Sequence, residues 1–193
     1  ALITHIDVNV VILTGGYNTA LLFSSWKNEL NLLAETSGKN AMILTACCDI
    51  DVAVKDLVQS AFGHAGQKCS AASRAYLPKS LWGDIKESVI KDVNSFKMGS
   101  PGDSSNFINA VIDDRAFKKL SGYLDQAKKD NDAEIIVGGN YDKSKGYFIE
   151  PTLIVAKDPK YVTMCEELFG PVLTLFVYED SDFEKTLTLI DTT

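Results

Sequence analysis

The amino-acid sequence predicts an α/β fold in which strands and helices alternate along the chain. Short apolar runs rich in β-branched residues recur, for example at residues 8–13 and 172–178, and such runs are typical of buried strands. Between them lie longer segments whose apolar residues are spaced three and four apart, as on one face of a helix. This pattern predicts an open twisted sheet flanked by helices.

The first part of the chain predicts a strand, a glycine turn, a helix and a second strand. The apolar run at residues 8–13 stops at Gly15 and Gly16, and residues 20–26 have helical character. Residues 30–34 are strand-like again. Glu35 therefore stands at the end of a strand.

The later elements follow from the same signals. Asp49 or Asp51 is suited to cap a helix that continues to about Gly63, because apolar residues recur there at helical spacing. Cys69 falls between this helix and the next strand, among small residues, and is expected on or near a loop. Further helices are expected over residues 80–96, 113–129 and 181–190, and further strands over residues 41–45, 74–77, 134–137, 147–155 and 172–178.

Composition excludes several classes of partner. The 26 acidic residues outnumber the 19 basic ones, so the net charge of −7 does not suit a polyanion such as a nucleic acid. No apolar stretch reaches the roughly 18 residues that span a bilayer, and the first residues do not resemble a signal peptide. We expect neither a nucleic-acid partner nor a membrane-spanning segment.

The cysteines indicate a reducing compartment. Four are present, none is in a C-x-x-C pattern, and the adjacent Cys47 and Cys48 can neither bridge each other without strain nor fill two corners of a zinc site. Only two histidines accompany them. We expect free thiols, no metal site and an intracellular location, with the mitochondrial matrix and the bacterial cytoplasm both possible.

Cys69 has the surroundings of a nucleophile. Gly66 before it and Ser70 after it allow backbone amides to approach an oxyanion, and Lys68 supplies positive charge that favours a thiolate. Glu35 is the candidate general base. The residues alone leave open a buried apolar cysteine and a solvated turn glutamate.

Four segments resemble the signature motifs of the aldehyde dehydrogenase superfamily. Residues 33–40 are similar to its glutamate motif and residues 66–70 to its cysteine motif, and the 34 positions between the two candidate catalytic residues match the family. Residues 166–172 are similar to its third signature, and residues 13–16 to the end of its cofactor-binding fold.

Two further segments, residues 60–71 and 110–113, resemble one branch of this superfamily. Members of that branch oxidise L-glutamate γ-semialdehyde to L-glutamate in proline catabolism, with NAD as the cofactor. The resemblance implies that the Cys69 thiolate adds to the aldehyde, that the thiohemiacetal gives up a hydride to NAD, and that a thioester remains. Glu35 would then activate the water that releases the acid.

The resemblance also implies binding roles. Glu167 would hold the nicotinamide ribose, Phe169 would contact the nicotinamide, and Gly16 would lie near the pyrophosphate. Lys68 would hold the substrate carboxylate through a charge-assisted hydrogen bond, and Ser70 would line the substrate pocket. Gly16 departs from the serine of many relatives, which removes a side-chain phosphate contact but permits a closer backbone approach.

The resemblance divides the chain into two parts. Residues 1–34 would be the C-terminal remnant of an NAD-binding domain, and residues 35–193 a catalytic domain truncated at its C-terminus. The chain has no G-x-G-x-x-G fingerprint, so we expect that alone it neither binds NAD well nor turns over aldehyde. The parent enzyme would be a homo-oligomer.

Other interpretations remain open. A dehydrogenase for another aldehyde would keep the same motifs. A reductase of acyl thioesters or acyl phosphates on the same scaffold would use the cysteine but would not need Glu35. A non-catalytic structural or binding relative would be expected to have lost Cys69, Glu35 or Glu167, and all three are present.

Overall fold

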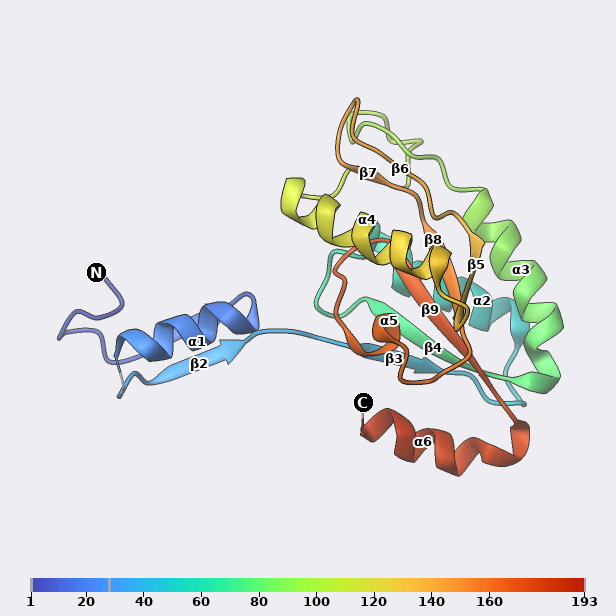
Figure 1. Cartoon of the computed structure of the whole chain (residues 1–193), viewed down its shortest axis with the longest axis horizontal. Helices are drawn as coiled ribbons and strands as arrows, with labels where there is room; N and C mark the ends of the chain where they lie inside the picture. The colour runs from blue at the N-terminus through green and yellow to red at the C-terminus, as the bar shows by residue number, and fades with distance from the viewer. Residues whose placement is uncertain (1, 28, 193) are drawn as a thin grey trace. The chain divides into compact units, whose positions relative to one another are not determined.

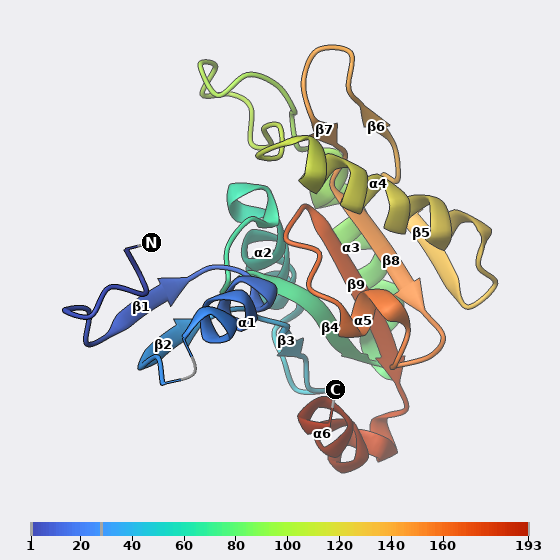
Figure 2. The ribbon, with the colours of Figure 1, turned by 60° about the vertical axis from the view of Figure 1, so that its left-hand side comes forward.

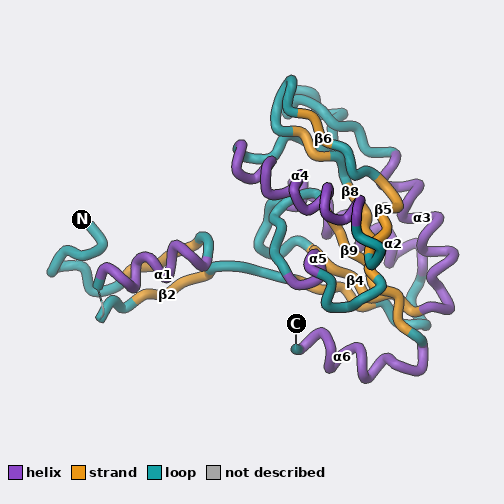
Figure 3. The backbone as a smooth tube through the Cα atoms, viewed as in Figure 1, coloured by secondary structure: helices purple, strands orange, loops and turns teal. Residues whose placement is uncertain are grey.

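The computed structural model describes residues 2–27 and 29–192, and its contacts divide the chain into two units, Ala1–Gly38 and Lys39–Thr193. Each unit has a sheet of its own, and each combines strands with helices (Figures 1 and 3). No helix in the described ranges is long and apolar enough to cross a membrane.

The first unit is a parallel β-α-β arrangement. It contains β1 (Val11–Thr14), α1 (Tyr17–Trp26) and β2 (Leu32–Glu35). The two strands run parallel, from Val11 opposite Leu32 to Thr14 opposite Glu35. Strand β1 begins at Val11 rather than at residue 8, because the preceding segment forms a turn in which the Val8 N–H donates to the His5 carbonyl.

The second unit is built on a five-stranded sheet in the order β3-β4-β9-β8-β5. Its strands are β3 (Asn40–Ile43), β4 (Ala72–Pro78), β5 (Ala133–Val137), β8 (Thr152–Ala156) and β9 (Val172–Tyr178). Strands β3, β4, β9 and β8 are parallel, and β5 pairs antiparallel with β8. A separate hairpin joins β6 (Tyr141–Asp142) to β7 (Phe148–Ile149).

The helices begin largely where capping residues predict. The Asp49 side chain accepts a hydrogen bond from the backbone of α2, and Asp113 does the same for α4. The helix expected from Ser80 begins at Trp82 instead, after a short 3₁₀ turn, because Asp180 accepts hydrogen bonds from both the Ser80 backbone N–H and hydroxyl. The helices are α2 (Ile50–Phe62), α3 (Trp82–Asn94), α4 (Asp114–Lys129), α5 (Val162–Cys165) and α6 (Phe183–Asp191).

The sheet of the second unit is covered on both faces (Figure 2). Successive side chains of a strand point to opposite faces, so Leu173 packs with α2 and α3 while Val172 packs with α4. A third cluster, around the buried Tyr76, packs against α5 and α6. These layers leave the loops between the strands and helices to carry the chemistry.

Candidate active site

A strained turn precedes Cys69. Helix α2 continues into a 3₁₀ turn, η1 (Gly63–Gly66), in which His64, Ala65 and Gly66 have φ values of 58°, 53° and 67°. Residues other than glycine rarely adopt this left-handed conformation, which costs on the order of 1–3 kcal/mol each. Such strain persists only where the surrounding structure enforces it, and it is common at functional sites.

Gly66 is where the cysteine motif meets the motif that contains Glu167. A Cβ atom at Gly66 would lie 2.2 Å from the carbonyl oxygen of Gly170, so only glycine permits this approach of the two backbones. Phe169, directly before Gly170, also has a positive φ of 58°. All three described non-glycine residues with positive φ therefore flank this contact.

Cys69 lies at the corner of an exposed turn. The turn is closed by a hydrogen bond of 3.1 Å from the Ala71 N–H to the Lys68 carbonyl. Lys68, Cys69 and Ser70 are all exposed, and the thiol is free, as are those of the other three cysteines. The expected loop position of Cys69 is confirmed, and in the described chain its side chain is exposed rather than buried.

Two amide side chains hold this turn in place. The Asn40 Nδ2 donates to the carbonyl of Cys69 at 2.5 Å and to that of Ala71 at 3.2 Å. The Gln67 Oε1 accepts from the backbone N–H of Ile112 at 2.9 Å. Neither Asn40 nor Gln67 was predicted as a site residue. Each lies within a family motif, and its polar amide side chain was the only signal in the sequence.

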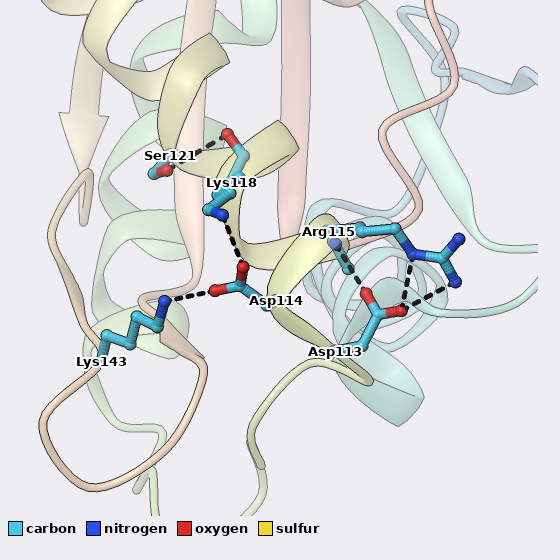
Figure 4. A network of polar contacts seen from close by, with 7 residues as sticks. Asp113, Asp114, Arg115, Lys118, Ser121 and Lys143 are labelled. Atoms are coloured by element: carbon cyan, nitrogen blue, oxygen red, sulfur yellow. Dashed lines mark hydrogen bonds and ion pairs between the residues drawn. The ribbon is translucent and has the colours of Figure 1, made fainter.

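The start of α4, which Gln67 contacts through Ile112, is fixed by a polar network (Figure 4). Asp113 accepts from the Ala116 N–H and pairs with Arg115 at 3.1 Å, and the first of these contacts holds the pKa of Asp113 below its ordinary value. The neighbouring Asp114 pairs with Lys118 and with Lys143, which lies in the loop after β6. The turn that carries Cys69 is thus joined to a firmly held helix end.

The segment that carries Glu167 is held by two lysines. Lys119 of α4 donates to the carbonyl of Glu167, and the Lys39 Nζ donates to the carbonyl of Thr163 at 2.8 Å. Burial, and secondly the charge of Arg74, lower the pKa of Lys39 to about 8. Glu167 is partly buried, whereas 42% of Phe169 is exposed.

In the first unit, Gly16 and Glu35 lie at the same edge of the sheet. The carboxyl ends of β1 and β2 meet there, and the Gly15 N–H donates to the Glu35 carbonyl at 3.0 Å. The Glu35 side chain is exposed, and within the described chain open space surrounds the position of a Cβ at Gly16. In α/β folds this edge, at the start of a helix, is where dinucleotide phosphates bind.

The predicted site residues therefore form two groups. Gly16 and Glu35 lie together in the first unit. In the second unit the Gly66–Gly170 contact brings together the two motifs that contain Lys68, Cys69, Ser70, Glu167 and Phe169.

Comparisons with known proteins support the family that these motifs resemble. The chain is 49% identical over 173 residues to a mitochondrial Δ1-pyrroline-5-carboxylate dehydrogenase of Dictyostelium discoideum, an alignment that covers 90% of this chain and 31% of the relative. A Mycobacterium tuberculosis protein of the same name superposes with a TM-score of 0.89 at 33% identity, over 98% of this chain and 36% of that one.

The NAD-bound form of that mycobacterial enzyme gives a TM-score of 0.85 at 34% identity, over 96% of this chain and 35% of that one. The chain thus spans about a third of the length of the relatives it matches. The model of the aldehyde dehydrogenase family matches residues 1–192. The resemblance drawn from the four motifs and the predicted α/β class are confirmed, and the chain belongs to the aldehyde dehydrogenase family.

Proposed function

We propose that the protein carrying this chain is an NAD-dependent aldehyde dehydrogenase that oxidises L-glutamate γ-semialdehyde to L-glutamate in proline catabolism. The observation that carries the proposal is an exposed Cys69 on a turn held by glycine contact and amide hydrogen bonds beside the Glu167 motif. The names of the relatives support the choice of substrate and, for the Dictyostelium relative, a mitochondrial compartment.

Cys69 is the nucleophile of this proposal. Its thiolate sulfur forms a bond to the aldehyde carbon, and the carbonyl oxygen takes up the negative charge as the C=O double bond becomes single. Backbone N–H groups of the small-residue turn are suited to stabilise that oxygen. The carbon then loses its hydrogen as a hydride, the C=O bond re-forms, and Cys69 holds the acyl group as a thioester.

Glu35 is the general base. Its carboxylate removes a proton from water as the water oxygen attacks the thioester carbon, and the carbon–sulfur bond breaks to release the carboxylic acid and the Cys69 thiolate. The exposed side chain at the carboxyl end of β2 is accessible to water, as this role requires.

The chain's residues fit the NAD that the family uses. NAD supplies the acceptor for the hydride when it is bound. Gly16 leaves room for a phosphate at the start of α1, the partly buried Glu167 carries a carboxylate suited to the ribose hydroxyls, and the exposed Phe169 ring is suited to contact the nicotinamide. We assign residues 1–34 to the cofactor domain and residues 35–193 to the catalytic domain.

Lys68 and Ser70 define the substrate end of the site. The exposed Lys68 ammonium lies next to the nucleophile, where it can pair with the carboxylate that distinguishes glutamate semialdehyde from a simple aldehyde. Ser70 lines the same surface on the other side of Cys69.

The test is an assay of the full-length protein with L-glutamate γ-semialdehyde and with an aliphatic aldehyde of the same chain length. We expect NADH formation that strongly favours the semialdehyde, and a loss of roughly a thousandfold or more in Cys69→Ala, as when other covalent nucleophiles are removed. Cys165→Ala, which removes another exposed thiol, is the matched control. Equal rates with both aldehydes, or an active Cys69→Ala variant, would contradict the proposal.

A further inference from the structure

Asn40 contacts the nucleophile's turn through its side chain and its main chain. Both carbonyls that its amide contacts, those of Cys69 and Ala71, belong to this turn, and an asparagine amide has two N–H groups to donate. The Asn40 carbonyl in addition accepts from the Ser73 hydroxyl at 3.4 Å. One residue at the start of β3 thus touches three residues of the segment that begins with Cys69.

The pairing of β3 with β4 explains why an amide is needed here. The register places Asn40 opposite Ala72, the first residue of β4, and it shifts directly after Asn40. Cys69 and Ala71 precede β4, so their carbonyls lie beyond the regular ladder between the two strands. The amide of Asn40 donates to them in place of a backbone N–H from a longer β3.

We propose that Asn40 is a positioning residue for Cys69, which holds the main chain of the nucleophile so that its sulfur meets the aldehyde carbon at a fixed place. The proposal rests on the function proposed above for Cys69. On its other side the turn is already held by the Gly66–Gly170 contact and by Gln67. The amide of Asn40 holds the C-terminal side of the turn. Without its hydrogen bonds this side can move, while the N-terminal side stays fixed.

Displacement of the Cys69 sulfur from the aldehyde carbon should lower the rate of the reaction. A displacement of about 1 Å of a reacting group costs up to about a hundredfold in rate. We therefore expect substitution of Asn40 to lower kcat about tenfold to a hundredfold and to leave the KM for NAD unchanged, since both hydrogen bonds of its amide go to the cysteine turn.

The experiment compares three variants of the full-length protein. Asn40→Ala removes both donors, Asn40→Asp places acceptors against the two carbonyls, and Asn40→Ser keeps a single donor. Asn40 is exposed, so these variants are expected to fold. Asn106→Ala is the matched control, because the Asn106 Nδ2 also donates to a backbone carbonyl, that of Ser100, in the loop between α3 and α4.

Two measurements are made on each variant. Hydrogen exchange of residues 66–72, followed by mass spectrometry, reports how firmly the turn is held. Steady-state kinetics separate kcat from the KM for NAD. We expect faster exchange and lower kcat in the Ala and Asp variants, an intermediate effect in Asn40→Ser, and neither change in Asn106→Ala.

Unchanged exchange in Asn40→Ala and Asn40→Asp would overturn the proposed hold on the turn. Faster exchange with unchanged kcat would overturn the positioning role. If the unmodified protein oxidised no aldehyde, the proposed function would fail instead, and the exchange data would still decide whether Asn40 holds the turn.

Discussion

Lys68 and Lys39 differ in burial, and their chemistry differs accordingly. Lys68 is exposed and precedes the nucleophile in the sequence, so its charge is available to a ligand. Lys39 is partly buried, and its ammonium donates to the carbonyl of Thr163. The first lysine is suited to recognise a substrate, and the second stabilises the protein segment that leads to Glu167.

For Lys68 we expect substitution to change substrate choice. Lys68→Met removes a charge-assisted hydrogen bond of about 1.5–3 kcal/mol, so the KM for L-glutamate γ-semialdehyde should rise about tenfold to a hundredfold. The KM for an aliphatic aldehyde should stay the same. Kinetics on both substrates, with the exposed Lys55→Met as control, measure the difference. An equal rise in KM for both aldehydes would rule out recognition of the carboxylate.

For Lys39 we expect a contribution to stability that depends on pH. Its folded-state pKa is lowered to about 8 from the ordinary 10.5, mainly by burial. Between these two pH values the unfolded chain holds a proton that the folded protein has lost, so the free energy of unfolding rises with pH. Below about pH 8 Lys39 is protonated in both the folded and the unfolded state, so burial of its charge lowers the free energy of unfolding by its full amount.

Urea titrations of the unmodified protein and of Lys39→Met measure this effect. The difference in unfolding free energy, unmodified protein minus variant, should increase by roughly 2–3 kcal/mol from pH 8 to pH 10.5. A difference that stays constant over that range would show that the charge of Lys39 is not buried in solution.

At the scale of elements, buried polar contacts join strands that local sequence does not link. Arg74 of β4 is 5% exposed and donates to the carbonyl of Lys39 at 3.1 Å, to the Tyr76 hydroxyl at 3.3 Å and to the carbonyl of Ile190 in α6 at 3.5 Å. The guanidinium therefore joins β4 both to the residue before β3 and to the last turn of α6, where a cation is favourable.

Loss of this side chain should destabilise the second unit. Arg74→Met removes the donor to the Lys39 carbonyl and to the Tyr76 hydroxyl, and the loss of hydrogen bonds to buried groups costs on the order of 1–3 kcal/mol. We expect the urea midpoint to fall accordingly. Arg74→Lys, which keeps the charge but not the fork of donors, should recover only part of the loss. A full recovery would mean that charge alone is important at this position.

The contact between Gly66 and Gly170 can be tested by comparing two glycine-to-alanine substitutions. Gly66→Ala places a Cβ 2.2 Å from a backbone oxygen at a positive φ, so the unfolding free energy should fall and the cysteine turn should move. Gly122→Ala, in α4 where the described structure leaves open space, should instead raise stability by about 1 kcal/mol. Denaturation of both variants measures this contrast in unfolding free energy. An unchanged unfolding free energy in Gly66→Ala would mean that the backbones of Gly66 and Gly170 lie further apart.

For the whole molecule, the sequence predicted local elements better than their assembly. The caps at Asp49 and Asp113 and most helix and strand positions followed from periodicity, because these depend on neighbours in the chain. Strand β5 was predicted, but its antiparallel pairing with β8, the β6–β7 hairpin and the short α5 were not. Pairing between strands that are distant in the sequence leaves no periodic signal within either one.

The same limit applies to the site. Cys69 and Glu35 could be proposed from local setting and from motifs, whereas the contact of Gly66 with Gly170 joins segments about a hundred residues apart and is visible only in the fold. The left-handed backbone at His64 and Ala65 was equally unpredictable from the sequence, because residues other than glycine adopt that conformation only rarely.

None of the described residues of the first unit belongs to a buried apolar core. Helix α1 buries none of its residues, and Ile12 and Leu33 are 79% and 57% exposed. Little buried apolar surface means low local stability, so in the 193-residue chain the amides of β1 and β2 should exchange faster than those of β4 and β9. NAD titration of this chain should accordingly show no micromolar affinity. Slow exchange in β1 and β2, or tight binding of NAD, would contradict this expectation.

The most direct test of Cys69 as the nucleophile is to trap its thioester in the full-length Glu35→Gln variant. Mixed with NAD and L-glutamate γ-semialdehyde, this variant should form the acyl group and release it slowly, because water is no longer activated. Peptide mass spectrometry should then find the glutamyl group on Cys69, with one equivalent of NADH formed. An acyl group on Cys47 or Cys165, or NADH formation without any acyl group, would contradict the assignment.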